Sequence, residues 1–230
     1  MKNNICKHIV IYLLLIFFTN NSNSAEPFNF DVTNIEILEN GNLFKGTGTG
    51  IITTENGIEI KADTFEYNKI KNILNANGNV ILKDKIQNYT IISDSVTYLK
   101  NVEVIFTKAN SKATSEDGKI IIADNFKYEK KENIINATGN VLLKDNVENY
   151  IISSENITYF KNLEKISTKG ETNATVQSKY RINSSDVLFL INDGLISSKN
   201  NSTLKDDNSN YYKLDNFSYS FNVPSIYING

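Results

Sequence analysis

Six acidic residues recur along the chain at intervals of 31, 30, 31, 31 and 29 residues, and their carboxylates are the groups best placed to do chemistry. They are Asp63, Asp94, Asp124, Glu155, Asp186 and Asp215. Paired carboxylates can cleave glycosidic bonds, and a repeated oxygen site can bind cations. An active site, however, needs two or three unlike groups that converge once. The even repetition therefore favours a structural role over a repeated cation site or a glycosidase site.

Other reactive side chains are scarce in this sequence. Cys6 and His8 are the only cysteine and histidine, and both lie in an N-terminal segment that we expect to be removed. Without them the mature chain has no thiol nucleophile, no Ser-His-Asp triad and no zinc site of the ordinary type. We therefore expect no enzyme activity, no cofactor and no metal site.

The N-terminal segment has the order of a secretory signal peptide. Lys2 and Lys7 precede an apolar run, Ile9 to Phe18, and small polar residues follow it. The run is too short to span a bilayer, for which about 20 apolar residues are needed. We expect a signal peptide over residues 1–24 and one β domain over residues 25–230, with a retained anchor as the alternative.

Charge gives no support for nucleic-acid binding. Residues 25–230 carry 22 basic and 26 acidic residues, a net charge of −4, and no cluster of bases resembles a nucleic-acid footprint. Arg181 is the only arginine, so bidentate recognition of phosphate could occur at one place at most. We expect no nucleic-acid partner.

The acids belong to a longer repeat. Residues 62–85 match residues 123–146 at 15 of 24 positions without a gap. Apolar and polar residues alternate within each unit, which is the period of a half-buried strand, but the apolar set changes parity at the acid. A β-bulge produces this change because one extra residue re-aims the side chains that follow. We therefore predict a bulge at each acid, with the carboxylate accepting backbone N–H groups that lack ladder partners.

A small residue stands fifteen residues after each of the first four acids, and a second alternating run follows it in the clearest copies. These residues are Gly78, Ala109, Gly139 and Gly170. Glycine within a strand commonly marks a bend or a close backbone approach. Each unit therefore reads as a hairpin-like pair of strands.

These patterns predict an all-β fold, since helical periodicity is nearly absent after the signal segment. An antiparallel sandwich or jelly roll competes with a parallel β-solenoid, and the hairpin-sized unit favours the first. We expect an antiparallel β-jelly roll, an open, folded two-sheet sandwich built from hairpin repeats of ~30 residues. Lys130 is expected on a turn, where its replacement by alanine should change stability by no more than about 0.5 kcal/mol, and the terminal strand is expected around Phe217.

The segments ADTFEY, ADNFKY, GNVILKD and GNVLLKD resemble the repeats of the OstA-like family of lipopolysaccharide-transport proteins. The resemblance covers the chain from about Ile58 to Tyr219. The family includes the soluble bridge protein LptA, the membrane-anchored LptC and the N-terminal periplasmic domain of LptD. The sequence resembles that LptD domain most, with a stand-alone LptA-like bridge protein as the alternative. A secreted β-repeat protein, such as a surface or carbohydrate-binding protein, is a reading from another class.

The resemblance implies a non-catalytic role in lipopolysaccharide transport and outer-membrane assembly. The apolar interior of the jelly roll would shield the acyl chains of lipid A in the periplasm or beside the outer membrane. The implied partners are lipopolysaccharide and other Lpt components (LptA, LptC, LptD/LptE), joined by edge-strand pairing. Head-to-tail oligomers are expected on the same ground.

Apolar residues at two fixed offsets from the acids are candidate lipid contacts, because stacked units would align them into a track. They are Phe65, Val96, Phe126 and Ile157, and the tyrosines Tyr67, Tyr98, Tyr128 and Tyr159. Core packing is the alternative role of the tyrosines. The structural repeat positions are Asp63, Asp94, Asp124 and Glu155 with Gly78, Gly139 and Gly170.

Overall fold

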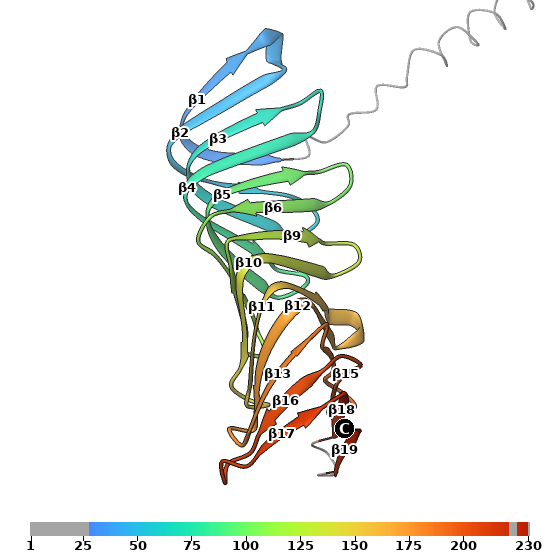
Figure 1. Cartoon of the computed structure of the whole chain (residues 1–230). Coiled ribbons are helices and arrows are strands. Elements are labelled where there is room, and N and C mark those ends of the chain that lie inside the picture. The colour runs from blue at the N-terminus through green and yellow to red at the C-terminus, as the bar shows by residue number, and fades with distance from the viewer. Residues whose placement is uncertain (1–27, 221–224, 230) are drawn as a thin grey trace, which may run out of the picture.

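The computed structural model describes residues 28–220 and 225–229. They form one antiparallel sheet of 19 strands with two short 3-10 turns, and no α-helix occurs among these residues. Neighbouring strands stack along one long axis, from β1 at one end to β17 and β19 at the other (Figure 1). The predicted all-β antiparallel class is confirmed. The boundary expected after residue 24 lies outside the described residues.

The strands are β1 (Asn29–Leu38), β2 (Leu43–Thr53), β3 (Ile58–Asn68), β4 (Ile73–Asp84), β5 (Tyr89–Leu99), β6 (Val104–Lys108), β7 (Ser111–Ser115), β8 (Lys119–Ala123), β9 (Asn125–Glu129), β10 (Ile134–Asp145), β11 (Tyr150–Phe160), β12 (Lys165–Val176), β13 (Tyr180–Ser185), β14 (Leu188–Leu190), β15 (Leu195–Ser198), β16 (Ser202–Lys205), β17 (Tyr211–Leu214), β18 (Asn216–Ser220) and β19 (Ser225–Asn229). The 3-10 turns are η1 (Glu39–Gly41) and η2 (Lys161–Leu163).

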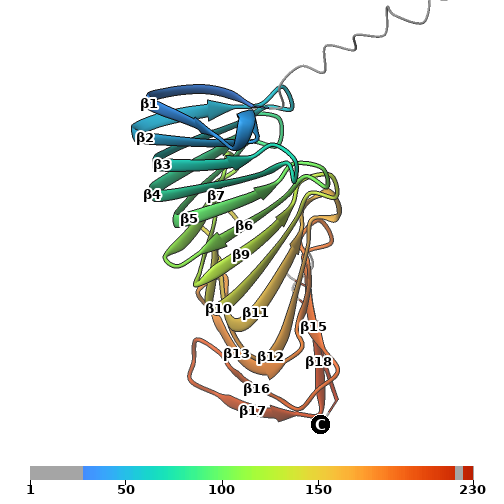
Figure 2. The same ribbon diagram turned by 90° about the horizontal axis from the view of Figure 1, so that it is seen from above.

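The ladder is interrupted at one place along every long strand. The register between β3 and β4 shifts at Lys61/Thr64, and that between β4 and β5 shifts at Asn77/Val80. Farther along, a pair of short strands replaces one long strand: β5 pairs with β6 over one half of its length and with β7 over the other. We call this line of interruptions the spine. The sheet folds along it into two layers of one continuous sheet, not two separate sheets (Figure 2).

Two rows of turns bound the folded sheet. The first rim comprises the turns at 69–72, 100–103, 130–133 and 161–164, and the second rim those at 54–57, 85–88, 116–118, 146–149 and 177–179. The first half-sheet lies between the spine and the first rim and contains β6 and β9. The second half-sheet lies between the spine and the second rim and contains β7 and β8.

Inward side chains change parity at the spine, as the sequence predicts. In β3, Ile60 and Ala62 precede the spine while Phe65 and Tyr67 follow it, and each side chain is at most 3% exposed. All four belong to one apolar core that runs through the described repeats.

The acids lie on the outer side of the spine, where asparagine side chains bind them. Asn79 donates to Asp63 from Nδ2 at 2.8 Å, and Asn140 donates to Asp124 in the same way at 3.1 Å. Asp186 does accept a backbone N–H, at 2.9 Å. The expectation that Asp124 is a buried acceptor for backbone N–H groups is wrong, because its side chain is exposed and its partner is an amide side chain.

Backbone groups freed at the spine bond to hydroxyl groups inside the fold. The Phe126 N–H donates to Oγ1 of Thr107 at 2.8 Å, and the Val187 N–H donates to Oγ1 of Thr168 at 2.8 Å. Both threonines are buried. A buried backbone N–H requires an acceptor, and inward hydroxyls supply it where the sequence suggested the outer acids.

The two ends of the sheet have free edges. Among the described strands β1 pairs only with β2, so its inward Ile35 and Ile37 remain 47% and 57% exposed. At the other end β17 pairs with β16 and β19 pairs with β18. The terminal strand expected around Phe217 is wrong, because Phe217 lies in β18 between β15 and β19.

Two features require glycine at position 139 of the spine: the backbone has a positive φ, and a side chain would clash with Asp124. Gly139 has φ +77°, and Asn140 after it also has a positive φ of 49°. A Cβ on Gly139 would lie 2.9 Å from Cγ of Asp124. By contrast, Gly118 has φ +88° but would place a Cβ in open space.

We expect Gly139→Ala to lower the free energy of unfolding by about 2–4 kcal/mol, since the clash adds to the backbone strain. Gly118→Ala is the matched control with backbone strain alone and should cost about 1 kcal/mol. Adding Asp124→Ala to Gly139→Ala should recover part of the loss in urea melts. Equal losses for the two glycine variants would contradict the close approach of Gly139 to Asp124.

Candidate functional site

All eight candidate lipid contacts lie in the interior of the first half-sheet, and none is more than 3% exposed. One set forms a row in direct register across neighbouring strands: Phe65 is opposite Ala76, and Ala76 is opposite Val96. Phe126 and Ile157 continue it on either side of Ala137. The recurring offsets in the sequence therefore correspond to one row, which is apolar except at the buried Thr107, opposite Val96 and hydrogen-bonded to the Phe126 N–H.

The tyrosines form a second row in the first half-sheet, closer to the first rim. Each tyrosine alternates with an aliphatic residue on the intervening strand. The row is Tyr67, Leu74, Tyr98, Ile105, Tyr128, Ile135, Tyr159 and Ile166. Because every member is at most 1% exposed, this row is core in the closed form of the protein.

The second half-sheet contributes a row that is almost wholly aliphatic and that was not among the predicted contacts. It comprises Ile52, Ile60, Leu82, Ile91, Ala113, Ile121, Leu143 and Ile152. The isoleucines three residues before each of the first four acids were the signal that could have identified it. The interior is thus enclosed by a tyrosine-containing layer and an aliphatic layer.

The tyrosine hydroxyls point to the place where the rims meet. Tyr128 donates to Oδ2 of Asp84 at 2.8 Å, and Tyr98 accepts a hydrogen bond from Asn56 at 3.0 Å. Burial raises the pKa of Tyr98 to about 12, although the Asn56 hydrogen bond opposes the shift. Burial, with the Asp84 carboxylate beside it, also raises the pKa of Tyr128. Both phenols therefore stay protonated at neutral pH.

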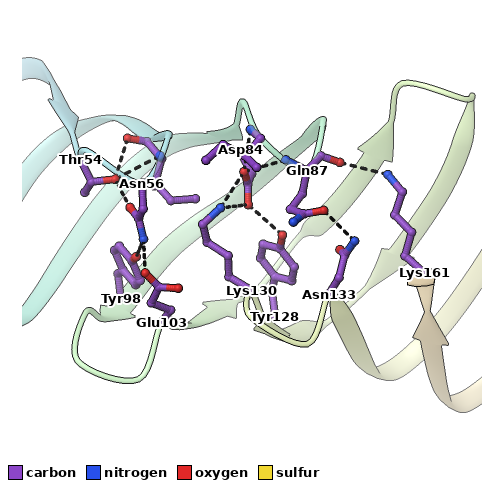
Figure 3. Close-up of polar contacts among 12 residues, drawn as sticks. Thr54, Asn56, Asp84, Gln87, Tyr98, Glu103, Tyr128, Lys130, Asn133 and Lys161 are labelled. Atoms are coloured by element: carbon purple, nitrogen blue, oxygen red, sulfur yellow. Dashed lines mark hydrogen bonds and ion pairs between the residues drawn. The ribbon is translucent and has the colours of Figure 1, made fainter. Parts of the chain in front are cut away.

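Polar contacts join the two rims along a line that we call the seam (Figure 3). Asn56 on the second rim contacts Glu103 on the first, and Gln87 accepts from Nδ2 of Asn133 at 2.7 Å. Lys161 donates to the Gln87 carbonyl at 3.0 Å. The seam closes the side of the interior opposite the spine.

The centre of the seam is a buried ion pair between Asp84 and Lys130. Nζ of Lys130 lies 2.9 and 2.8 Å from the two carboxylate oxygens, and the side chains are 0% and 6% exposed (Figure 3). The N–H groups of Ile86 and Gln87 also donate to Asp84, both at 3.0 Å. Lys130 does lie on a turn, as expected, but its side chain is buried and crosses the seam to neutralise the Asp84 carboxylate.

A second charged group lies farther along the seam around Lys119. Its Nζ is 2.6 Å from Asp117, 3.6 Å from Glu164 and 3.7 Å from Asp145. Burial would lower the pKa of Lys119, but the surrounding carboxylates outweigh it and the pKa is raised. Asp145 and Asp84 are equivalent residues of the duplicated segment, and each ends a Leu-Lys-Asp sequence that could have identified them.

Hydrogen bonding along the seam is incomplete. Oη of Tyr89 and Oδ1 of Asn133 are buried and have no hydrogen-bond partner within the described part of the chain. Such atoms are uncommon in folded proteins. The closed seam is therefore less completely satisfied than the sheet ladders on either side of it.

Within residues 28–220 and 225–229, no cluster of three or more histidine, cysteine or acidic side chains could hold a metal ion. Over the same residues, no helix has the length and apolar character needed to cross a membrane. The interior instead offers two continuous apolar layers and a polar line at which they could separate.

Comparison with known proteins gives a distant match. No family model and no curated protein matches the sequence. Among solved structures, the crystal structure of LptH from Pseudomonas aeruginosa, the LptA-homologous periplasmic component of the lipopolysaccharide transport device, matches with 14% identity and a TM-score of 0.46. The match covers 50% of this chain and 83% of that chain. Because the sequence identity and the TM-score are this low, the function of this chain has to be argued from its own contacts.

Removing the seam cation should destabilise the fold strongly. Lys130→Met would leave the Asp84 carboxylate buried without a counter-ion, and we expect a loss of about 3–5 kcal/mol in urea melts. The matched control is Lys85→Met, since Lys85 forms a 2.6 Å ion pair with Glu59 but is 61% exposed, and it should cost at most about 1 kcal/mol. Adding Asp84→Asn to Lys130→Met should recover part of the loss. A loss no larger than that of the control would show that the pair does not close the seam.

Proposed function

We propose that this protein is a non-catalytic carrier that encloses the acyl chains of lipopolysaccharide between its two half-sheets during passage through the periplasm. The observation that carries the proposal is the continuous apolar interior, which runs in register through all the long strands and ends at free sheet edges. An apolar track of this kind shields a lipid without chemistry, because apolar area is removed from water at about 25 cal/mol per Å².

In this proposal the seam is the route by which lipid enters. The candidate contacts, among them Phe126 and Tyr128, are at most 3% exposed, so acyl chains can reach them only after the rims separate. Separation breaks polar contacts that water can replace, whereas the apolar surface it exposes would be covered by the incoming chains. The seam is therefore the side of the fold where opening costs least.

We infer that the protein works in series with similar domains. Ile35 and Ile37 continue the inner rows at the edge of β1 and are left half exposed. A strand added to that edge would cover them and extend the ladder. LptA-, LptC- or LptD-type domains, or a second copy, would meet this requirement.

Two kinds of lipopolysaccharide-transport protein would have an interior of this kind. The divergent sequence after Arg181 favours the N-terminal periplasmic domain of an LptD-type protein, next to the outer membrane. A stand-alone LptA-like bridge protein is the second candidate. Both require export, for which the signal-like segment over residues 1–24 is the support.

Lipid capture can be tested with the seam free and with the seam locked. A photo-crosslinking residue at Phe126 should capture lipopolysaccharide in cells, detected as a shifted band. A disulfide across the seam, Asn56→Cys with Glu103→Cys, should reduce capture about tenfold or more until it is reduced, because only the open form admits lipid. The control disulfide, Asn136→Cys with Thr158→Cys, joins neighbouring strands of one half-sheet and should not change capture. Capture that is absent from the unlocked protein, or equal in both locked forms, would refute entry through the seam.

Association at the β1 edge can be tested separately. Ile35→Lys with Ile37→Lys should weaken oligomers or complexes with a related domain at least tenfold, since charges on an edge strand oppose strand addition. The control pair, Ile70→Lys with Leu163→Lys, changes residues that are 73% and 64% exposed on the first rim and should have no effect. Sedimentation velocity measures both. Equal weakening by the two pairs would exclude β1 as the contact.

A further inference from the structure

The outer face of the second half-sheet has an unusual composition from β4 to β12. Its outward residues away from the spine are six aliphatic side chains, three lysines and five small polar residues, and the one acid of these strands that shares the face is Glu171, beside the spine at the β12 end. The residues away from the spine are Ile81, Lys83, Thr90, Ile92, Lys112, Thr114, Ile120, Ile122, Leu142, Lys144, Ile151, Ser153, Asn173 and Thr175. We call this surface the lysine–isoleucine face. Seven strands at the usual spacing make it about 30 Å wide.

The aliphatic residues of this face are contiguous and open to solvent. Ile122 lies directly opposite Leu142, and both Ile92 and Ile122 lie opposite Lys112 on the strand between them. Their exposed fractions are 45% for Ile92, 43% for Ile122 and 37% for Leu142, and Ile151 nearby is 40% exposed. Isolated exposed aliphatics need no explanation, but a contiguous patch marks an interaction site.

The outer face of the first half-sheet differs, although the same repeats build it. There the polar groups satisfy one another: Thr97 donates to Asn75 at 2.8 Å, and Lys127 pairs with Glu129 at 3.0 Å. On the lysine–isoleucine face, Lys112 has no ion pair or hydrogen bond from its ammonium group within the described residues, and the same is true of Lys144. Lys112 and Lys144 are therefore available to an external partner, whereas Lys83 lies 3.9 Å from the Glu59 carboxylate on β3.

Charge and shape together indicate the kind of partner. Lysines interleaved with aliphatic residues suit a surface that is anionic at its boundary and apolar beneath, because the lysine stems pack on apolar surface while the ammonium groups reach the anions. Two copies facing each other through this surface would oppose lysine to lysine, which is unfavourable.

The nearest acids bound the face and do not interrupt it. Asp94, Asp124 and Glu155 lie along the spine, and Glu116 and Glu148 lie on turns of the second rim. Glu59 on β3, opposite Lys83, borders the face at one end, and Glu171 on β12 borders it at the other. The strands bend at the spine (Figure 2), so its acids lie on the ridge where the outer surface turns away. The cationic, apolar centre can therefore meet a flat surface while the ridge remains outside the contact.

We propose that the lysine–isoleucine face docks on a bilayer surface that contains acidic lipids, holding the protein side-on to the membrane. This contact is separate from the interior and does not depend on lipid entering through the seam. It would leave the outer face of the first half-sheet toward water and the β1 edge free for strand addition.

The test is co-sedimentation of the exported protein with vesicles, all variants carrying the same N-terminus. Vesicles of phosphatidylethanolamine with about a quarter phosphatidylglycerol provide the acidic surface, and phosphatidylcholine vesicles provide the neutral one. Lys112→Gln with Lys144→Gln should weaken binding to the acidic vesicles about 30-fold. Lys45→Gln with Lys127→Gln removes two cations that are 44% and 43% exposed on the other outer face, and it should change binding less than twofold.

A second pair of variants separates apolar docking from charge alone. Ile122→Ser with Leu142→Ser should weaken binding about tenfold in low and high salt alike, since apolar contact is not screened. Urea melts should show each variant to be folded. Equal binding to neutral and acidic vesicles, or equal loss in the two lysine pairs, would overturn the proposal. So would no vesicle binding at all, or face variants that change only self-association or binding to another protein.

Discussion

Every long strand of this protein has to bend at the same distance from its turns, and the rest of the structure depends on that bend. The left-handed Gly139-Asn140 pair and its equivalents make it possible outside, while buried threonine hydroxyls receive the displaced backbone N–H groups inside. One sheet can then cover both sides of its own core. The interior, the two rims and the seam between them all follow from this single line of interruptions.

The periodic sequence predicts what is repeated and misses what crosses the fold. The alternation of apolar and polar residues on either side of each acid is a local property of the sequence. The strands, the bulges and the inward rows can therefore be predicted from it. Lys130 shows the limit, because nothing near it in the sequence distinguishes it from any turn lysine. Its partner Asp84 lies 46 residues away, at the end of β4 beside a turn of the second rim. Asp124 failed as a backbone acceptor for a similar reason, since alternation cannot say which face of a bulge the unpaired N–H groups meet.

The same repeats produce three surfaces with different properties. Inside, both layers contribute to one apolar core. Outside, one half-sheet satisfies its polar groups internally, whereas the other leaves Lys112 and Lys144 without ion-pair partners and several isoleucines exposed. Because adjacent residues of a strand point to opposite faces, duplication could fix the inner residues while the outer ones diverged. The inner and outer surfaces can therefore serve separate purposes without compromising one another.

The sequence separation between residues that contact each other across the seam also affects how the chain folds. The side-chain contacts across the seam join residues 42 to 74 positions apart, so none links the two ends of the molecule. Contact order is consequently modest for an all-β fold. A turn of the second rim contacts a turn of the first rim that is only one or two repeats away along the chain. A chain that emerges from a translocation channel N-terminus first could thus complete its structure vectorially, one repeat after another. Each newly formed strand would cover the apolar edge left by the previous one, which limits the time for which that edge is open to aggregation.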